Sequence, residues 1–491
     1  MADGRRGSDR REPRALDPYD FVFVREPFIS YVSLNMSDSP KKSIFDLGRQ
    51  RFARNIRWQF VANGSQAVIG GAYLIVLGRF LGAAEFGVFS AVTALVSVAG
   101  LLFEMRLQEV VARDFCHLDD EVPASSPDAP HLIDLFVLEA LSRLLPSLGL
   151  VASASMAASL IRIPAEQANL IVLAAVGFLV SKAGTGVSTG LLRVLGRTDL
   201  IAGCMAADWG LRLVVTAIPA VAAHLSVTMA LWIALLTGGA INALQVRLAY
   251  REFTVRVAPI RSEGWTPAAA WRRSRHARRL ILSNLGVSGT DLMAKDLDVA
   301  LISGLLPSEK VGLYKMAKSF VQVAWRAIDP FYIAIMPEIQ KLWQRSKIDE
   351  LNTLLKKTSL RLFVLSSFLV LTVNAVVALL GARLLGPQYI DISSLMPLMS
   401  VWLMVCAPMI WGLPLAVAIN RPELSVGGSL LGLLVGLVSF SMLTPQHGLS
   451  GAAIAWNATL ISGFAFTITT SIWIARRTPA FRKEDIRGGP A

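Results

Sequence analysis

The chain has 491 residues, of which 54% are hydrophobic and 17% are charged, and its mean hydropathy is +0.53. A soluble domain has about 45–50% apolar and about 25% charged residues. This composition excludes an ordinary soluble enzyme, a disordered protein and a fibrous protein. It leaves a polytopic helical membrane protein.

Twelve apolar runs are each long enough for a helix to cross a bilayer. They cover residues 58–78, 86–104, 133–157, 168–190, 204–222, 227–246, 280–304, 312–336, 358–381, 394–418, 424–443 and 450–474. A membrane β-barrel has shorter segments of alternating polarity. The sequence therefore predicts an all-α membrane protein with about 12 transmembrane helices.

The net charge of +13 indicates topology rather than a nucleic-acid partner. Arginine is concentrated in residues 1–57 and in the loop 247–279, and the alternate set of loops holds little beyond Arg79, Arg162, Lys310 and Arg383. Cytosolic loops carry the excess of Lys and Arg. Both the tail 1–57 and the tail 475–491 are therefore predicted to be cytosolic. Met36 begins a second plausible start, so the place of residues 1–35 in the native protein stays open.

The second half of the chain repeats features of the first. At an offset of 225, residues 86–89 (FGVF) align with 311–314 (VGLY), and at an offset of 224, residues 195–200 (LGRTDL) align with 419–424 (INRPEL). At the second offset Trp232 also aligns with Trp456, and Gly239 with Gly463. Six spans per half make the repeat parallel. We expect two six-helix bundles, 58–246 and 280–474, related by a pseudo-two-fold axis and joined by a basic linker, 247–279.

Two segments resemble a known family. Residues 78–89 (GRFLGAAEFGVF) are similar to the family's "LG-x-x-x-[FY]-G-x-[FY]" opening of the second span. Residues 298–314 (DVALISGLLPSEKVGLY) are similar to its "D-x-x-[LI]-[LI]-x-x-L-x-[GP]-x-x-x-[VA]-G-x-Y" segment, and Pro337 and residues 448–453 also fit. Over residues 50–478 the chain resembles the bacterial polysaccharide (O-antigen and exopolysaccharide) flippases of the multidrug/oligosaccharidyl-lipid/polysaccharide exporter superfamily. The tail 1–57 and the loop 247–279 depart from that pattern.

The resemblance implies alternating-access transport of polyprenyl-diphosphate-linked oligosaccharide units from the cytosolic to the outer leaflet of the bacterial inner membrane. The units would serve lipopolysaccharide or exopolysaccharide synthesis. Glycan hydroxyls lose their water partners in hydrocarbon, so the carrier needs a polar cavity, and cations suit the diphosphate. Expected partners are the lipid-linked glycan, membrane lipids and other polysaccharide-assembly proteins. A monomeric transport unit is expected, because one chain holds both halves.

Charged side chains inside spans are costly, and they usually face a cavity or a partner. The candidate substrate-binding cations are Arg326, Lys295, Arg143, Lys182, Arg212, Lys315 and Lys318. Arg326 and Lys295 come first, because their spans flank the predicted interface between the halves. Lys315 and Lys318 have an alternative as residues that extend to the membrane surface. The candidate coupling acids are Asp291 and Asp298.

Several of these charges have a structural alternative as pairs on one helix face. The pairs with suitable spacing are Glu139–Arg143, Asp208–Arg212, Asp291–Lys295 and Lys295–Asp298.

Two other functions have less support. An ion-coupled drug or metabolite antiporter of the same superfamily is disfavoured because the resemblance implies an acid in the first span of drug exporters, and the span 58–78 has none. A membrane polysaccharide polymerase or glycosyltransferase is disfavoured because the predicted external loops are short. No GxxxxGK[ST] motif is present, and the histidines and the cysteines Cys116, Cys204 and Cys406 have no metal spacing, so we expect no enzyme activity, metal or cofactor. The glycan and the coupling ion are not encoded in any motif.

Overall fold

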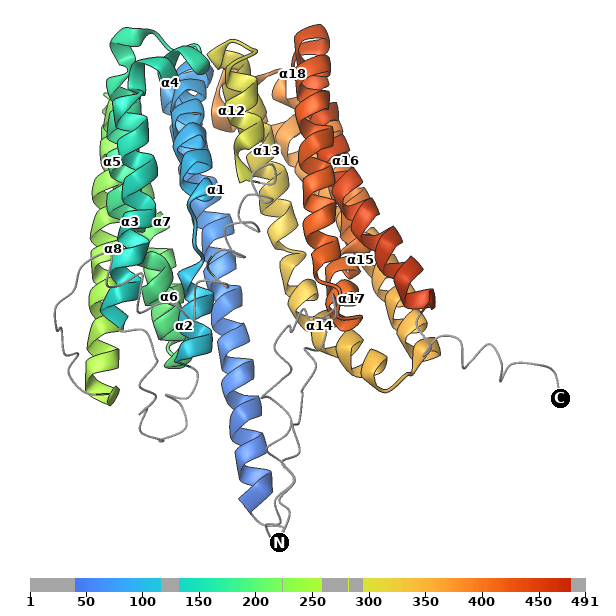
Figure 1. Ribbon diagram of the computed structural model, residues 1–491. Helices are drawn as coiled ribbons and strands as arrows, with labels where there is room; N and C mark the ends of the chain where they lie inside the picture. The colour runs from blue at the N-terminus through green and yellow to red at the C-terminus, as the bar shows by residue number, and fades with distance from the viewer. Residues whose placement is uncertain (1–39, 116–131, 223, 258–280, 282–294, 478–491) are drawn as a thin grey trace, which may run out of the picture. The chain divides into compact units, whose positions relative to one another are not determined.

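The computed structural model describes residues 40–115, 132–222, 224–257, 281 and 295–477 (Figure 1). The chain divides into a unit of residues 1–54 and a unit of residues 55–491. Of the first unit, only the backbone of a helix from Pro40 onward is described. Asp291, Cys116 and most of the predicted linker lie outside the described residues, and the paragraphs below concern the second unit.

One group of packed helices comes from the first half of the chain. It consists of α1 (Pro40–Leu102), α2 (Leu107–Asp114), α3 (Leu132–Ala152), α4 (Ala154–Leu160), α5 (Asn169–Lys182), α6 (Thr185–Val194), α7 (Thr198–Val221) and α8 (Val227–Val257), with a 3₁₀ turn at Ala165–Gln167. Helix α5 packs between α3 and α8, α6 and α7 both pack on α8, and α2 packs on α6. We call this set the N-terminal group.

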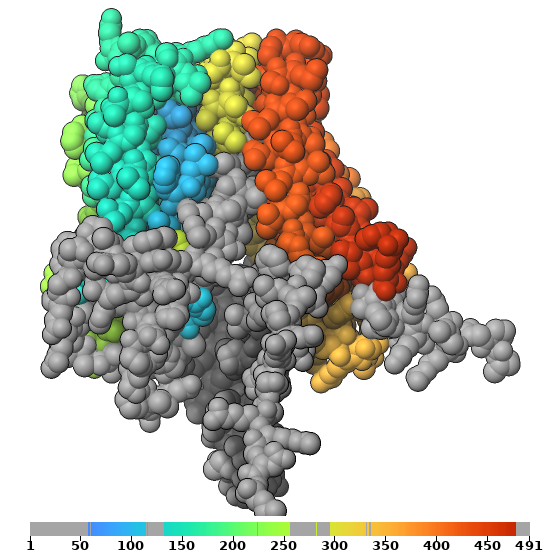
Figure 2. Space-filling model, viewed as in Figure 1, coloured from blue at the N-terminus to red at the C-terminus, as the bar shows by residue number. Residues whose placement is uncertain are grey.

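A second group of packed helices comes from the second half of the chain, and we call it the C-terminal group. It consists of α12 (Leu297–Ser303), α13 (Ser308–Arg326), α14 (Asp329–Gln344), α15 (Ile348–Leu385), α16 (Ile392–Cys406), α17 (Gly412–Ala418) and α18 (Glu423–Arg477), with 3₁₀ turns at Pro387–Tyr389 and Ala407–Met409. Helix α16 is central, because it contacts α13, α15 and α18. The two groups lie side by side, one blue to green and the other yellow to red (Figure 1 and Figure 2), and α1 of the first packs on α13 of the second. The predicted bundle boundaries stay predictions.

Eight helical segments are long and apolar enough to cross a membrane, which agrees with the predicted polytopic all-helical class. They are Phe60–Leu102, Leu132–Ala152, Ala165–Val194, Thr198–Val221, Val227–Val255, Ile348–Leu385, Ile392–Ala418 and Glu423–Arg477. The part of the chain that the structure describes contains no strand.

Two of the eight segments each contain two of the predicted apolar runs. Helix α1 is interrupted at Gly82 (φ 78°), and α18 at Gly448 (φ 59°), where the backbone takes a conformation that glycine adopts without strain. The count of twelve spans stays a prediction, because the run 280–304 lies partly outside the described residues.

The connections define two ends of the helices. Figure 1 shows α2, α6 and α17 at one end of the helices. Arg106, Arg197 and Arg421 belong to the connections beside these helices, so we call this the Arg106 end. Figure 1 shows α4 at the other end, which we call the Gly82 end because α1 is interrupted at Gly82 between its two spans.

The turns after α6 and α17 repeat in atomic detail, in support of the predicted repeat. Gly196 and Asn420 both have positive φ, 68° and 61°. In each copy, the N–H of the following arginine donates to the carbonyl five residues earlier. Arg197 donates to Leu192 and Arg421 donates to Ala416, both at 2.8 Å. Each arginine also pairs with an acid two residues on, Asp199 and Glu423. Such a turn satisfies the last carbonyls of a helix.

The repeated glycine motif places α1 directly against α13. A Cβ atom on Gly87 would overlap the Ser308 carbonyl, and one on Gly312 would overlap the Ala83 carbonyl. Each hypothetical Cβ would also lie 3.1 Å from the backbone nitrogen of the other glycine. Small residues allow helix backbones to approach this closely in membranes. The two aligned copies of the motif thus form one contact between the groups.

This contact predicts that Gly87→Ala destabilises the protein. The added methyl group meets backbone rather than a movable side chain, and overpacking of this kind costs about 1–3 kcal/mol. The apparent melting temperature of the full chain in detergent should fall. Gly64→Ala is the matched control, because it lies in the same helix and has no atom within 4 Å of its Cβ position. An unchanged melting temperature for Gly87→Ala would contradict the close crossing.

Candidate functional site

A cavity of about 720 Å³ lies between the two groups, and we call it the central cavity. On the N-terminal side, its wall comes from α3, α5, α6, α7 and the two arms of α1, which are the parts of α1 before and after Gly82. On the C-terminal side, its wall comes from Lys295, Asp296 and α13. Six cations line it: Arg106, Arg143, Lys182, Lys295, Lys315 and Arg326. Three carboxylates line it: Glu104, Glu139 and Asp296. Cations therefore outnumber acids by two to one.

Contacts at the Gly82 end join the two groups beyond the cavity. The Arg79 guanidinium donates to the carbonyl of Arg383, at 2.7 Å, near the end of α15. The Arg162 guanidinium donates to the carbonyl of Leu305 at 3.3 Å. With the Gly87–Gly312 crossing, these contacts hold the groups together at the Gly82 end. Arg106 and Gln108 in the cavity wall place the cavity toward the Arg106 end.

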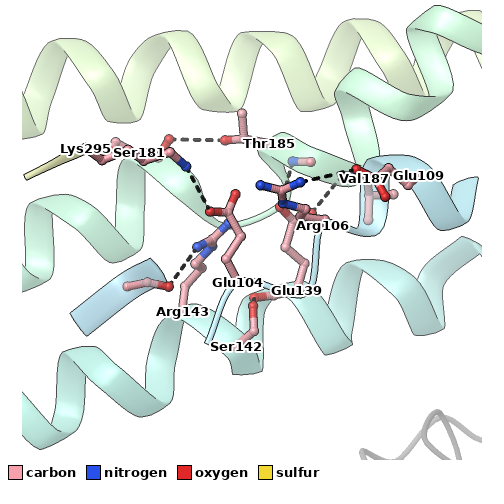
Figure 3. A network of polar contacts seen from close by, with 12 residues as sticks. Glu104, Arg106, Glu109, Glu139, Ser142, Arg143, Ser181, Thr185, Val187 and Lys295 are labelled. Atoms are coloured by element: carbon pink, nitrogen blue, oxygen red, sulfur yellow. Dashed lines mark hydrogen bonds and ion pairs between the residues drawn. The ribbon is translucent and has the colours of Figure 1, made fainter. Parts of the chain in front are cut away.

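Glu104 lies between one cation from each group (Figure 3). One of its carboxylate oxygens is 3.5 Å from the Arg143 guanidinium, and the other is 3.8 Å from the Lys295 ammonium. Arg143 also donates to the Gly100 carbonyl at 3.3 Å. The arginine is nearly buried, whereas 46% of the Lys295 side chain is exposed. Glu104 is thus the acid that links α3 and the segment before α12 across the cavity.

Glu139 binds backbone and not Arg143, which corrects the pairing predicted from helical spacing. Its two carboxylate oxygens accept the N–H groups of Gly186 and Val187, at 2.6 and 2.8 Å (Figure 3). These N–H groups belong to the first turn of α6, which starts after Gly184 in a left-handed conformation. A carboxylate is stabilised there by unsatisfied N–H groups and by the helix dipole. Glu139 therefore anchors α3 to α6.

The two lysines of α13 have different environments. Lys315 lines the central cavity and donates to Asp296 at 2.6 Å. Lys318 is fully buried, donates to Asp298 at 2.7 Å and to the Lys295 carbonyl, and lies 4.3 Å from the centre of the Trp456 ring.

Asp298 and Lys318 therefore form a core ion pair. Asp298 also accepts the Tyr314 hydroxyl at 2.7 Å and does not line the central cavity. From the sequence, Lys318 is expected to face the cavity or the membrane surface, and Asp298 is spaced to pair with Lys295. The structure places both residues in the core, because the two charges neutralise each other there.

Arg212 lies in a second cavity, of about 540 Å³, within the N-terminal group. It donates to Asp208 at 2.8 Å, which confirms the pairing predicted from their spacing. Lys182 lines both cavities. The structure thus brings together five of the seven predicted cations, namely Arg326, Lys295, Arg143, Lys182 and Lys315, in the central cavity. Their role in binding substrate stays a prediction.

Four charged residues of the central cavity were not among the predicted site candidates. Arg106 lies in a predicted loop, and Glu104, Glu139 and Asp296 lie inside predicted spans. The sequence feature that could have identified them is a charged residue within or next to an apolar span. Among the described residues, no three His, Cys, Asp or Glu side chains form a group that could hold a metal ion.

The family described as "Polysaccharide biosynthesis protein" matches residues 52–343. The chain belongs to this family, since the match covers more than half of its length. No curated protein matches the chain.

Solved transporters of the MOP superfamily share the fold. An inward-facing multidrug resistance MATE family transporter has 15% identity and a TM-score of 0.60, covering 87% of this chain and 96% of its own. A variant of a MATE transporter from Vibrio cholerae has 15% identity and a TM-score of 0.54, covering 90% and 99%. A MOP superfamily transporter from Pyrococcus furiosus, described as having a binding pocket of reverse polarity, has 15% identity and a TM-score of 0.53, covering 88% and 96%. The chain therefore belongs to the polysaccharide biosynthesis family, has the fold of these transporters, and carries the long apolar helices of a multi-pass membrane protein.

The buried pair predicts a large loss of stability for Asp298→Asn. The substitution leaves the Lys318 ammonium without a counter-charge, and breaking a buried ion pair costs about 3–5 kcal/mol. Asp298→Asn combined with Lys318→Met should recover most of the loss, because the remaining amide still accepts the Tyr314 hydroxyl. Thermal unfolding of the full chain in detergent measures both effects.

The control is Glu423→Gln in the exposed pair with Arg421, where we expect less than about 1 kcal/mol. If Asp298 instead serves as a coupling acid only, Asp298→Asn will keep its melting temperature and lose transport.

Proposed function

We propose that this protein transports polyprenyl-diphosphate-linked oligosaccharide from the cytosolic to the outer leaflet of a bacterial inner membrane by alternating access. Both termini are proposed to be cytosolic. The lipid-linked units would serve the synthesis of a surface polysaccharide.

The excess of cations around the central cavity is the observation that carries this proposal. Six cations face three carboxylates, and the carboxylates are engaged by neighbouring cations or backbone N–H groups. A diphosphate carries several negative charges and suits the forked guanidinium of Arg and the point charge of Lys. The same cavity offers polar surface to a glycan that cannot enter hydrocarbon unaided.

The contacts between the groups support an alternating mechanism. The Gly87–Gly312 crossing and the Arg79 hydrogen bonds join the groups at the Gly82 end, and the cavity lies toward the Arg106 end. The excess of Lys and Arg in the loops at the Arg106 end supports a cytosolic location for that end. In this arrangement a lipid-linked substrate reaches the cavity from the cytosolic side, and release requires the Gly82 end to separate.

The antiporter alternative has weaker support. The MATE neighbours are about 15% identical, so they show the fold and not the cargo. The first arm of α1 carries no acid over residues 58–78.

The double variant Lys182→Gln with Arg326→Gln should abolish most transport. Each lost charge-assisted contact to the diphosphate removes about 1.5–3 kcal/mol, and about 1.4 kcal/mol is a tenfold change. We expect at least a tenfold loss of surface polysaccharide in a deletion strain that carries the double variant at wild-type protein levels. Mass spectrometry of inner-membrane lipids should show accumulated lipid-linked repeat units.

The control variant is Lys347→Gln with Arg421→Gln, which removes two exposed cations outside the cavity. It should restore polysaccharide to the deletion strain. A deletion strain with unchanged lipid-linked glycan and altered drug sensitivity would overturn the proposal and favour the antiporter.

A further inference from the structure

The second cavity adjoins the central cavity without being part of it, and we call it the side cavity. It lies inside the N-terminal group, with walls from α1, α5, α6, α7 and α8. Gln66, Ser97, Phe178, Lys182, Thr185 and Trp209 line both cavities. A ligand in the central cavity therefore has a neighbouring space of about 540 Å³, within the range of small-molecule sites.

The side cavity has a different chemistry from the central cavity. Its wall carries hydroxyl and amide groups, including Thr93, Ser181, Asn242 and Gln245. Its Arg212 is neutralised by Asp208, and Gly238 leaves room for this arginine, because a Cβ there would lie 2.8 Å from the guanidinium. The cations other than Arg212 are Lys182, which is shared, and Arg193, which is exposed in the last turn of α6. Such a wall suits a neutral polyhydroxylated group better than a diphosphate.

Two aromatic rings lie where the cavities meet, and neighbouring residues fix both. The Trp209 ring packs against Gly70, where a Cβ would lie 3.3 Å from it, and meets the Tyr73 ring edge-on at 5.9 Å. The Phe178 ring occupies the space that a side chain on Gly100 would need. The Arg143 guanidinium lies 5.6 Å from the centre of the Phe178 ring. The Arg212 guanidinium lies 5.5 Å from the centre of the Trp209 ring. The negative face of an aromatic ring attracts the C–H hydrogens of a sugar, so the face of each fixed ring that no guanidinium covers makes a stacking platform.

We propose that the side cavity is the glycan subsite, which takes the sugars nearest the diphosphate while the central cavity holds the diphosphate itself. This inference rests on the proposed function and adds that the two cavities bind different parts of the same substrate. The diphosphate stays with the excess cations, and the neutral sugars pass Trp209 and Phe178 into the hydroxyl-lined space. The shape of the side cavity then contributes to selection among glycans.

Thiol protection in the full-length protein tests the division. Ser181→Cys places a thiol of nearly the same size in the side cavity, and Val323→Cys places one in the central cavity. Cys204 lines the side cavity and is replaced by Ser in both variants. Cys406 is buried, lines neither cavity and serves as the internal reference. The rate of labelling by a small methanethiosulfonate is read peptide by peptide by mass spectrometry.

Two probes are compared: undecaprenyl diphosphate without sugar, and the same lipid carrying the host's repeat unit, extracted from a deletion strain. We expect both to slow labelling of Val323→Cys at least fivefold, and only the sugar-bearing lipid to slow labelling of Ser181→Cys to that extent. Protection of Val323→Cys alone by both probes would overturn the glycan subsite and leave the proposed function standing. Protection of Ser181→Cys by the sugar-free lipid would also overturn the subsite. Protection of neither thiol by either probe would overturn the proposed function as well.

Trp209→Leu separates stacking from simple exclusion. It keeps apolar bulk and removes the ring face, so the sugar-bearing lipid should protect Ser181→Cys at least threefold less and Val323→Cys as before. The matched control is Trp232→Leu, because Trp232 is about half exposed and lines neither cavity. Equal protection of Ser181→Cys in both variants would overturn the stacking role.

Discussion

An ionised side chain inside the apolar part of a membrane needs a counter-charge, a polar partner or water, and the arrangement of the described helices follows from this constraint. Asp298 and Lys318 meet it by pairing in the core of the C-terminal group. Glu139 meets it by accepting two backbone N–H groups of α6. Six other cations line the central cavity, whose open volume separates them from the hydrocarbon. Helix packing and cavity chemistry are thus two results of the same electrostatic requirement.

The positions of many helices could be predicted from the sequence, because a helix that crosses hydrocarbon needs about 20 consecutive apolar residues. The predicted runs 58–78 and 86–104 fall on the two arms of α1, and the runs 424–443 and 450–474 fall on the two arms of α18. The predicted repeat depends partly on glycines, and a glycine required by close backbone contact tolerates no larger residue. Gly87 and Gly312 aligned at one offset, and they meet in space.

The partners of individual charged residues were harder to predict. Helical spacing identifies pairs only within one helix, whereas several of these residues bind groups on other helices. Asp208–Arg212 was predicted correctly, since both residues lie on α7. The partners of Glu139 and Lys318 were not, because they lie on other helices, α6 and α12. Residue type and depth were enough to select Arg326, Lys295, Arg143, Lys182 and Lys315 as cavity candidates. Only the packing of α1, α5 and α7 revealed that a second cavity adjoins the first.

The position of Glu104 between Arg143 and Lys295 has a consequence for turnover. A carrier of the proposed kind must return empty after each delivery, and bare cations would oppose that return through an apolar barrier. In the proposed cycle Glu104 would act as a resident counter-ion, which holds both cations when the cavity is empty and gives way to a more highly charged diphosphate. Loading would then exchange one anion for another at these two cations, and the return of the empty carrier would leave neither of them without a counter-charge.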